Sequence, residues 1–232
     1  MTLYKHYSFD LWMTLIRSNP AFKKERAAFF YSNFNATKKT IGEIEQIFRQ
    51  VDVMCNAINE KTGKNIDSEE MYLMVIYEMN DRQDFPDIDL EWLYAEMEQL
   101  VMKYIPVAYG VETVETLNKI KDAGDTTISL LSNTAFIKGI TLRKVLKEIE
   151  LDHFFDFQLY SDESGMSKPN SGFFLQMVDQ AGKHRKENKI ELRQIIHVGD
   201  NRHADILGAE AIGIDSLLVN SNENTLSRLL QS

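Results

Sequence analysis

The chain has 232 residues, of which 44% are hydrophobic, and a formal net charge of −9 at neutral pH. This length suits one large domain, or one domain that carries a sizeable insert. The acidic balance argues against a nucleic-acid or membrane-surface partner, and no apolar run of about 18 residues predicts a transmembrane helix.

Two further features of the sequence favour a cytoplasmic protein. The single cysteine, Cys55, has no partner for an internal disulfide, and it lies in a helical pattern that predicts ordinary core packing. Residues 1–6 lack the apolar block that is typical of a signal peptide. Neither feature indicates an oligomeric state.

The first part of the chain predicts one strand followed by an all-helical stretch. Residues 4–10 form a short, mainly apolar segment that predicts a β-strand ending at Asp10. From Pro20 to Ile105 the pattern is helical, and four successive helices can close a small bundle. The expected helices are 21–34, one that begins with the capping pair Thr40 and Glu43, one capped by Asp67, and one around 92–104.

From Val111 onward, predicted helices and strands alternate. The helices are expected at 111–123, 137–149, 171–181 and 203–211, and the strands at 126–131, 157–160, 195–198 and 216–219. This alternation is typical of a parallel, doubly wound sheet. The first strand must join that sheet, because a lone strand is unstable in water.

The sequence therefore predicts an α/β fold, in which a Rossmann-like parallel sheet carries an inserted α-helical bundle. The expected core domain comprises residues 1–16 and 107–232, and the expected cap domain comprises residues 17–106. The connections near Ile16–Arg17 and Pro106–Val107 should act as hinges that let the cap close over the carboxyl edge of the sheet.

Acidic side chains follow two of the predicted strands. Asp10 ends the first strand, at the edge where open α/β sheets bind ligands. Asp200 and Asp205 follow the strand at 195–198 across a turn that begins at Gly199, so both carboxylates can face one point. One or two carboxylates, completed by water and substrate phosphate, make a typical Mg²⁺ site.

Two other segments carry groups that suit a phosphate. Ser132 and Asn133 follow the strand at 126–131, and Lys168 stands in a turn before a helix, where it can offset the charge of a carboxylate nucleophile and a transferring group. Each residue alone also has an ordinary explanation as a helix cap, a turn residue or a solvated charge. Phosphoryl transfer through an aspartyl intermediate explains all of these segments with one site.

In this order the segments resemble the four motifs of the haloacid dehalogenase-like hydrolase superfamily, and the insert resembles its helical cap. The similarity covers residues 4–16 and 107–220 and is carried by Phe9–Leu15, Leu131–Asn133, Gly165–Pro169 and Val198–Asp205. The resemblance implies that Asp10 is the nucleophile, oriented by Thr14, that Ser132 and Asn133 bind the substrate phosphate, and that Lys168 balances charge. It further implies that Mg²⁺ is held by Asp10, Asp200, Asp205 and the backbone carbonyl of Trp12.

Trp12 is the departure from that pattern. Phosphatases of the superfamily usually carry an aspartate at this position, which protonates the leaving group and then activates water. An indole does neither, because it only donates a hydrogen bond. The sequence thus predicts a Mg²⁺-dependent hydrolase of a small phosphorylated metabolite with impaired or unusual acid–base catalysis.

Two alternatives stay open. The first alternative is a non-catalytic protein that binds phosphate esters. The second is a metal-independent 2-haloacid dehalogenase, because dehalogenating members of the superfamily also lack the second aspartate. The pair Gly199–Asp200, which those members lack, favours phosphoryl chemistry.

Overall fold

A five-stranded parallel sheet organises the structure, a computed structural model that describes residues 4–83, 85–185, 190–222 and 224–230. Within these residues the strand order is β5-β4-β1-β6-β7, and each neighbouring pair is parallel. The strands are β1 His6–Phe9, β4 Thr127–Ser132, β5 Phe157–Tyr160, β6 Ile195–Gly199 and β7 Asp215–Leu218. The predicted α/β fold is confirmed, and each strand lies within two residues of its expected bounds.

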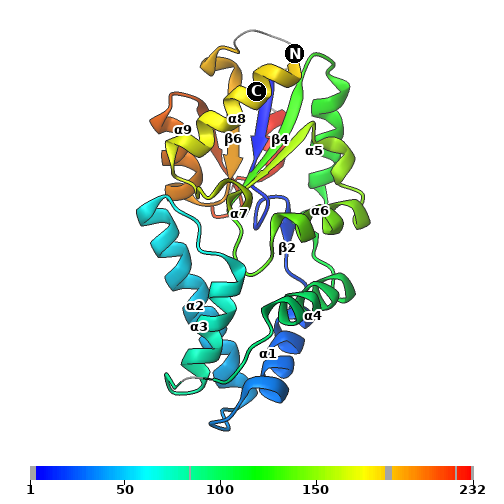
Figure 1. Cartoon of the computed structure of the whole chain (residues 1–232). Helices are drawn as coiled ribbons and strands as arrows, with labels where there is room; N and C mark the ends of the chain where they lie inside the picture. Colours follow the sequence, from blue (N-terminus) through cyan, green and yellow to red (C-terminus); the bar gives the residue numbers. More distant parts are fainter. Residues whose placement is uncertain (1–3, 84, 186–189, 223, 231–232) are drawn as a thin grey trace.

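Helices cover both faces of this sheet (Figure 1). On one face, α5 Glu112–Asp122 and α6 Gly139–Glu148 pack their apolar sides against Tyr7 and Phe9 of β1. On the other face, α8 Ser171–Arg185 and α9 Gly208–Ala211 form a separate apolar cluster. Successive side chains of a strand point to opposite faces, and so β1 directs His6 and Ser8 toward the α8 face.

Three local differences from expectation lie in this part of the chain. The helix predicted at 171–181 continues to Arg185, and a short helix, α7 Ser161–Ser164, follows β5 without a sequence signal. The helix predicted at 203–211 divides into a π-helical segment, Arg202–Leu207, and α9.

The all-helical stretch forms a unit with its own core. This helical unit consists of α1 Pro20–Phe34, α2 Ile41–Thr62, α3 Ser68–Met79 and α4 Leu90–Lys103. The predicted capping box begins α2, since the Thr40 backbone N donates to Glu43 Oε2 at 2.7 Å and the Glu43 backbone N donates to Thr40 Oγ1 at 3.3 Å. Cys55 is buried in this core, as its helical spacing predicted.

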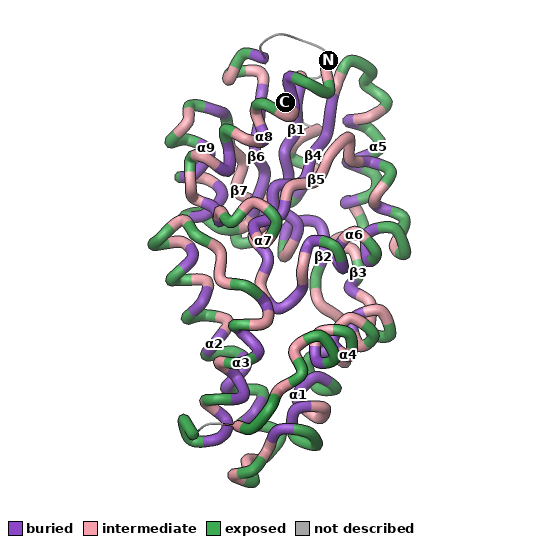
Figure 2. The backbone as a smooth tube through the Cα atoms, viewed as in Figure 1, coloured by how far each residue is buried: buried purple, intermediate pink, exposed green. Residues whose placement is uncertain are grey.

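The helical unit faces the carboxyl ends of the strands (Figure 1). Two short strands, β2 Ile16–Arg17 and β3 Val107–Ala108, pair antiparallel at the junction, where hinges were expected. Phe136, from the segment between β4 and α6, inserts into the core of the helical unit, and its carbonyl accepts a hydrogen bond from the Tyr72 hydroxyl at 2.9 Å. Figure 2 shows buried positions running through the strands and along the inner sides of α1 to α4.

Among the described helices, none combines the length and the apolar character that a membrane crossing requires.

His6, in the central strand, makes the fold sensitive to acid. Its ring is buried and hydrogen-bonded to Thr127 Oγ1 at 2.8 Å and Ser129 Oγ at 3.0 Å, and burial lowers its pKa to about 3. The unfolded chain takes up this proton near pH 6.5, about the ordinary pKa of histidine. The stability contributed by neutral His6 is therefore complete about one pH unit above 6.5, begins to fall through pH 6.5, and falls by about 1.4 kcal/mol per pH unit from about pH 5.5 toward 3.

Urea unfolding between about pH 7 and pH 5 tests this linkage. The free energy of unfolding should fall more steeply with acid for the wild type than for His6→Gln, by about 1 kcal/mol per pH unit averaged over this range. His153→Gln, which changes an exposed histidine, should keep the wild-type slope. Parallel profiles for the wild type and His6→Gln would show that His6 does not govern the acid response.

Candidate active site

A cavity of about 360 Å³ lies between the carboxyl edge of the sheet and the helical unit. Segments that follow β1, β4 and β6 line one side, and residues of α1 and α2 line the other. Ligand pockets commonly measure about 300–1,000 Å³, and so this cavity suits a small molecule.

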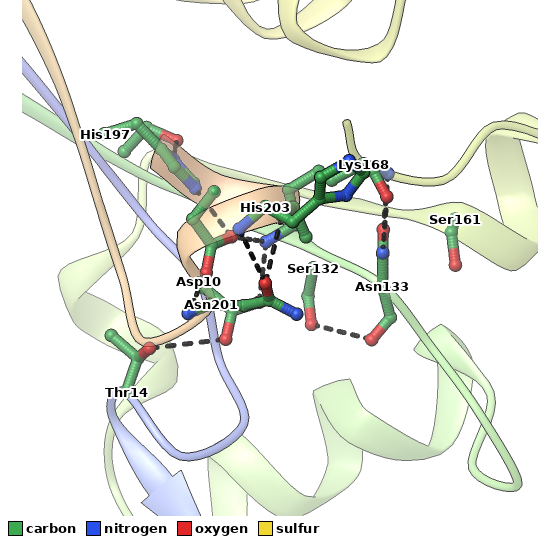
Figure 3. A network of polar contacts seen from close by, with 12 residues as sticks. Asp10, Thr14, Ser132, Asn133, Ser161, Lys168, His197, Asn201 and His203 are labelled. Atoms are coloured by element: carbon green, nitrogen blue, oxygen red, sulfur yellow. Dashed lines mark hydrogen bonds and ion pairs between the residues drawn. The ribbon is translucent and has the colours of Figure 1, made fainter. Parts of the chain in front are cut away.

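Lys168 is the centre of the polar network beneath this cavity (Figure 3). Its Nζ lies 2.7 Å from Asp10 Oδ1 and 2.7 Å from Asp205 Oδ1, while the side chain is only 1% exposed. Asn133 fixes the backbone of Lys168 at two points, because its Oδ1 accepts from Lys168 N at 2.7 Å and its Nδ2 donates to Lys168 O at 3.0 Å. The ammonium is thus held in one place by segments that follow three strands.

Asp10 is anchored where β1 ends. Its backbone N donates to Val198 O at 2.9 Å, and the Thr14 hydroxyl donates to Asp10 Oδ2 at 3.3 Å. Burial raises the pKa of Asp10 to about 7, with Lys168 opposing the shift and Asp205 adding to it. Hydrogen bonds therefore orient both oxygens of the Asp10 carboxyl group, and the positive charge of Lys168 does not fully offset its burial.

Asp205 has a different electrostatic environment. Oδ1 receives Lys168 Nζ and lies 3.2 Å from His197 Nε2, and Oδ2 accepts from Asn201 N at 2.9 Å. Burial acts to raise the pKa of Asp205, but Lys168 and His197 outweigh it, and the net shift is downward. Asp205 is thus a stable carboxylate whose oxygens are both occupied by donors.

His197 supports Asp205 from within β6. Burial lowers the pKa of His197, and a neutral ring must donate from Nε2 because a carboxylate only accepts. Its Nδ1 then accepts from Ser8 Oγ, which lies 2.9 Å away. The role of His197 was not predicted, although a polar residue inside an otherwise apolar strand was the available signal.

Three carboxylates come close enough to share one cation. Oxygens of Asp10, Asp200 and Asp205 all lie within 4.8 Å of one another. Burial raises the pKa of Asp200 to about 6, and the nearby Asp205 carboxylate adds to this shift. Three carboxylates against one ammonium leave an excess of negative charge, and such an oxygen donor set fits a hard divalent cation.

The other predicted residues lie around this centre. Ser132 is fully buried, and its hydroxyl donates to Asn133 O at 3.2 Å. Ser132 and Thr14 support the network from beneath, whereas Asn133 and Trp12 line the cavity itself. Trp12 therefore lines the cavity at the position where phosphatases of the superfamily usually carry an aspartate.

The helical unit adds residues that the sequence analysis did not assign to the site. They are Phe22, Lys23 and Arg26 of α1 and Asp52, Asn56 and Glu60 of α2. Glu60 Oε1 accepts from Asn201 Nδ2 at 2.8 Å, which connects α2 to the segment after β6. No strand end precedes these residues, and so nothing in the local sequence marked them.

The family pattern described as "Haloacid dehalogenase-like hydrolase" matches residues 7–219. The chain belongs to this family of hydrolases, and the resemblance carried by the four motifs is confirmed.

Individual relatives are more distant. Glyceraldehyde 3-phosphate phosphatase from Methanothermobacter thermautotrophicus is 34% identical over 111 residues, a match that covers 47% of this chain and only 43% of that protein. The magnesium-bound HAD-hydrolase YfnB from Bacillus subtilis superposes with a TM-score of 0.70 at 14% identity, over 95% of this chain and 91% of that chain. A 2-haloacid dehalogenase from Pseudomonas syringae pv. Tomato DC3000 gives 0.66 at 18% identity, over 98% and 97%. At such low sequence identity, these two matches show only that this chain shares its fold with both structures.

Removal of the Lys168 charge should destabilise the protein strongly. Lys168→Met leaves two buried carboxylates without their cation, and breaking a buried pair in this way costs about 3–5 kcal/mol. Urea unfolding at neutral pH in chelator measures the loss. The control is Lys144→Met, which removes an ion pair with Glu98 in which the lysine is 51% exposed, and about 0–1 kcal/mol is expected there. Equal losses in the two variants would contradict the central role of Lys168 in the network.

Proposed function

We propose that this chain is a Mg²⁺-dependent phosphohydrolase of a small phosphate ester and that it works through an aspartyl-phosphate intermediate on Asp10. The observation that carries the proposal is the buried Lys168 ammonium between Asp10 and Asp205, on the floor of a cavity of about 360 Å³. The 34% identity to a sugar-phosphate phosphatase over 111 residues supports the same reaction class.

In this proposal Asp10 attacks phosphorus, forming an oxygen–phosphorus bond as the bond to the leaving alcohol breaks. Water then attacks the phospho-aspartate, which releases phosphate and restores the carboxylate. Lys168 and Thr14 hold one Asp10 oxygen each, which keeps the nucleophile oriented. Asn133, which lines the cavity, is assigned to the phosphate oxygens. The same role for Ser132 stays a prediction, because its buried hydroxyl donates to Asn133 O and would have to turn toward the cavity to reach a phosphate.

We assign the metal to Asp10, Asp200 and the Trp12 carbonyl. When bound, Mg²⁺ supplies positive charge that offsets the repulsion between a carboxylate and a phosphate dianion. Asp205 belongs to the same acidic group, but its side chain is only 1% exposed, against 10% for Asp10, and it has a third close donor, since His197 Nε2 lies 3.2 Å from Oδ1 in addition to the contacts from Lys168 and Asn201. We therefore assign Asp205 chiefly to positioning Lys168, with metal coordination secondary.

We also propose that residues 17–106 act as a cap domain on a core domain of residues 1–16 and 107–232. The paired β2 and β3 strands would serve as its hinge, and closure would exclude water from the cavity. Residues 1–3, 84, 186–189, 223, 231 and 232 of these ranges lie outside the described residues.

The first test is phosphate release from a panel of small phosphate esters. Activity should require Mg²⁺, disappear in chelator, and fall at least about 10³-fold in Asp10→Asn, because an amide of the same shape is not a nucleophile. Asp179→Asn is the matched control, because Asp179 forms an exposed ion pair with Lys183 on α8. Activity that survives Asp10→Asn would remove Asp10 from its proposed role.

Trp12 supports a second candidate, a protein that binds phosphate esters without turning them over. An indole in the cavity wall offers no proton to a leaving group and no base to water. Isothermal calorimetry separates the two functions, because tight binding of an ester that stays intact supports the binder. The cluster of three carboxylates counts against a metal-independent dehalogenase, which needs one carboxylate nucleophile.

Replacement of Trp12 by an acid should increase phosphate release. We expect Trp12→Asp to raise kcat by about 10²–10⁴-fold, the usual contribution of general acid–base catalysis. Trp12→Asn opens the same space without a titrating group and is the control for lost packing. Equal rates in Trp12→Asp and Trp12→Asn would show that the acid at this position is not what limits the reaction.

A further inference from the structure

Arg26, on α1, is a buried charge that has no carboxylate of its own. It lines the cavity, although the residue is only 9% exposed, and its Nε has no hydrogen-bond partner. Burial lowers the pKa of Arg26, and the charge of Asp52 and a side-chain hydrogen bond with Tyr72 offset part of that effect. A buried charge that is only partly compensated is destabilising, so a ligand that completes its hydrogen bonds is a reason to keep it.

Aromatic rings hold the guanidinium in place. Its central carbon lies 3.9 Å from the ring centroid of Phe48, 4.7 Å from that of Phe136 and 5.3 Å from that of Phe22. Cation–π contacts are individually weak and only partly offset the burial of the charge. They do restrict the plane of the group, so that its N–H fork is arranged before any ligand binds.

Within the described residues, neither acidic group on this side of the cavity forms an ion pair with Arg26. Glu60 receives Asn201 Nδ2 at 2.8 Å and lies 3.3 Å from His203 Nδ1. Burial raises the pKa of Asp52, and the charge of Arg26 opposes that shift without a direct contact between the two groups. Within the described part of the helical unit, Arg26 is thus a buried cation of the cavity whose Nε is available to a ligand.

The chemistry of this group selects the ligand. One planar guanidinium matches the two oxygens of a carboxylate, and such bidentate pairs are short and strong. A second phosphate dianion would need more positive charge than Arg26 alone supplies, and the nearby Asp52 carboxylate repels a dianion more strongly than a singly charged group. A singly charged carboxylate is the better match.

We propose that Arg26 binds a carboxylate group of the substrate while the phosphoryl group lies at Lys168. Both residues line the same cavity, so one small molecule can contact both. This assignment rests on the proposed function for the phosphoryl end and narrows the substrates to small phosphate monoesters that also carry a carboxylate.

The test compares phosphate monoesters with and without that carboxylate. The esters of glycolate, 3-hydroxypropionate and 4-hydroxybutyrate are each paired with the monophosphate of the diol of the same length. At one chain length or more, the wild type should favour the carboxylate ester at least about tenfold in kcat/KM, as a charge-assisted bidentate contact predicts. In Arg26→Met this ratio should fall at least about fivefold, whereas Arg26→Lys, which keeps the charge and loses the fork, should fall less.

Lys24→Met is the matched control, because it removes an exposed cation from the same helix outside the cavity and should keep the wild-type ratio. A ratio near one at every length, or a ratio unchanged in Arg26→Met, would overturn the assignment. Should Arg26→Met fail to fold, the ratio in Arg26→Lys decides, and it must drop at least about threefold.

A failure of the proposed function is distinguishable from a failure of this assignment. If the wild type hydrolyses none of the esters, calorimetric titration with the same pairs replaces the rates. A Kd for one carboxylate ester at least about tenfold below that of its diol partner, lost in Arg26→Met, supports the Arg26 site without turnover. Equal Kd values for the pairs, or no binding of either member, would overturn it.

Discussion

The buried contact of the Lys168 ammonium with two carboxylates is the constraint on which the site depends. Asp10 and Asp205 both point at Nζ from 2.7 Å, and neither would stay charged at that depth without it. The lysine is in turn fixed by Asn133, and the adjacent Ser167 N donates to Gly63 O at 3.1 Å, in the segment that joins α2 to α3. One ion-pair centre therefore connects the strand ends, the Lys168 turn and the helical unit.

The carboxylates around this centre divide into two kinds. Asp205 has a lowered pKa because Lys168 and His197 outweigh the effect of its burial, and His197 with Ser8 extends that support into the sheet. Asp10 and Asp200 have raised pKa values because burial outweighs the positive charge available to them. The structure thus keeps one carboxylate as a fixed counter-charge and leaves two whose negative charge an added cation would stabilise, and the proposed metal-assisted reaction rests on this difference.

The sequence predicted those parts of the site that follow from strand order. Asp10, Lys168 and Asp200 each come just after a strand or before a helix of the α/β pattern, and parallel strands bring their carboxyl ends to one edge. Arg26 was not predicted, because a cationic residue in an amphipathic helix has the same local pattern whether it faces solvent or a cavity. Its position depends on how the helical unit packs against the segment around Phe136, a long-range contact that no local pattern encodes. The spacing of Asp205 in the sequence likewise indicated a carboxylate at the site. It did not indicate that Lys168, His197 and Asn201 would donate to its oxygens, because these contacts also depend on long-range packing.

The cavity combines an aromatic wall with an ionic floor, and the two steps of the proposed reaction differ in their need for water. Phe22, Phe136 and Trp12 bring aromatic surface to a cavity whose floor is ionic, and low access of water strengthens every charge–charge contact there. In the proposed reaction, that environment would favour the binding of an anionic ester and the attack by Asp10. The second half of the proposed reaction would need a water molecule that is positioned and deprotonated, and Trp12 offers it no base. Under this proposal, hydrolysis of the phospho-aspartate is therefore the step that depends most on the identity of residue 12.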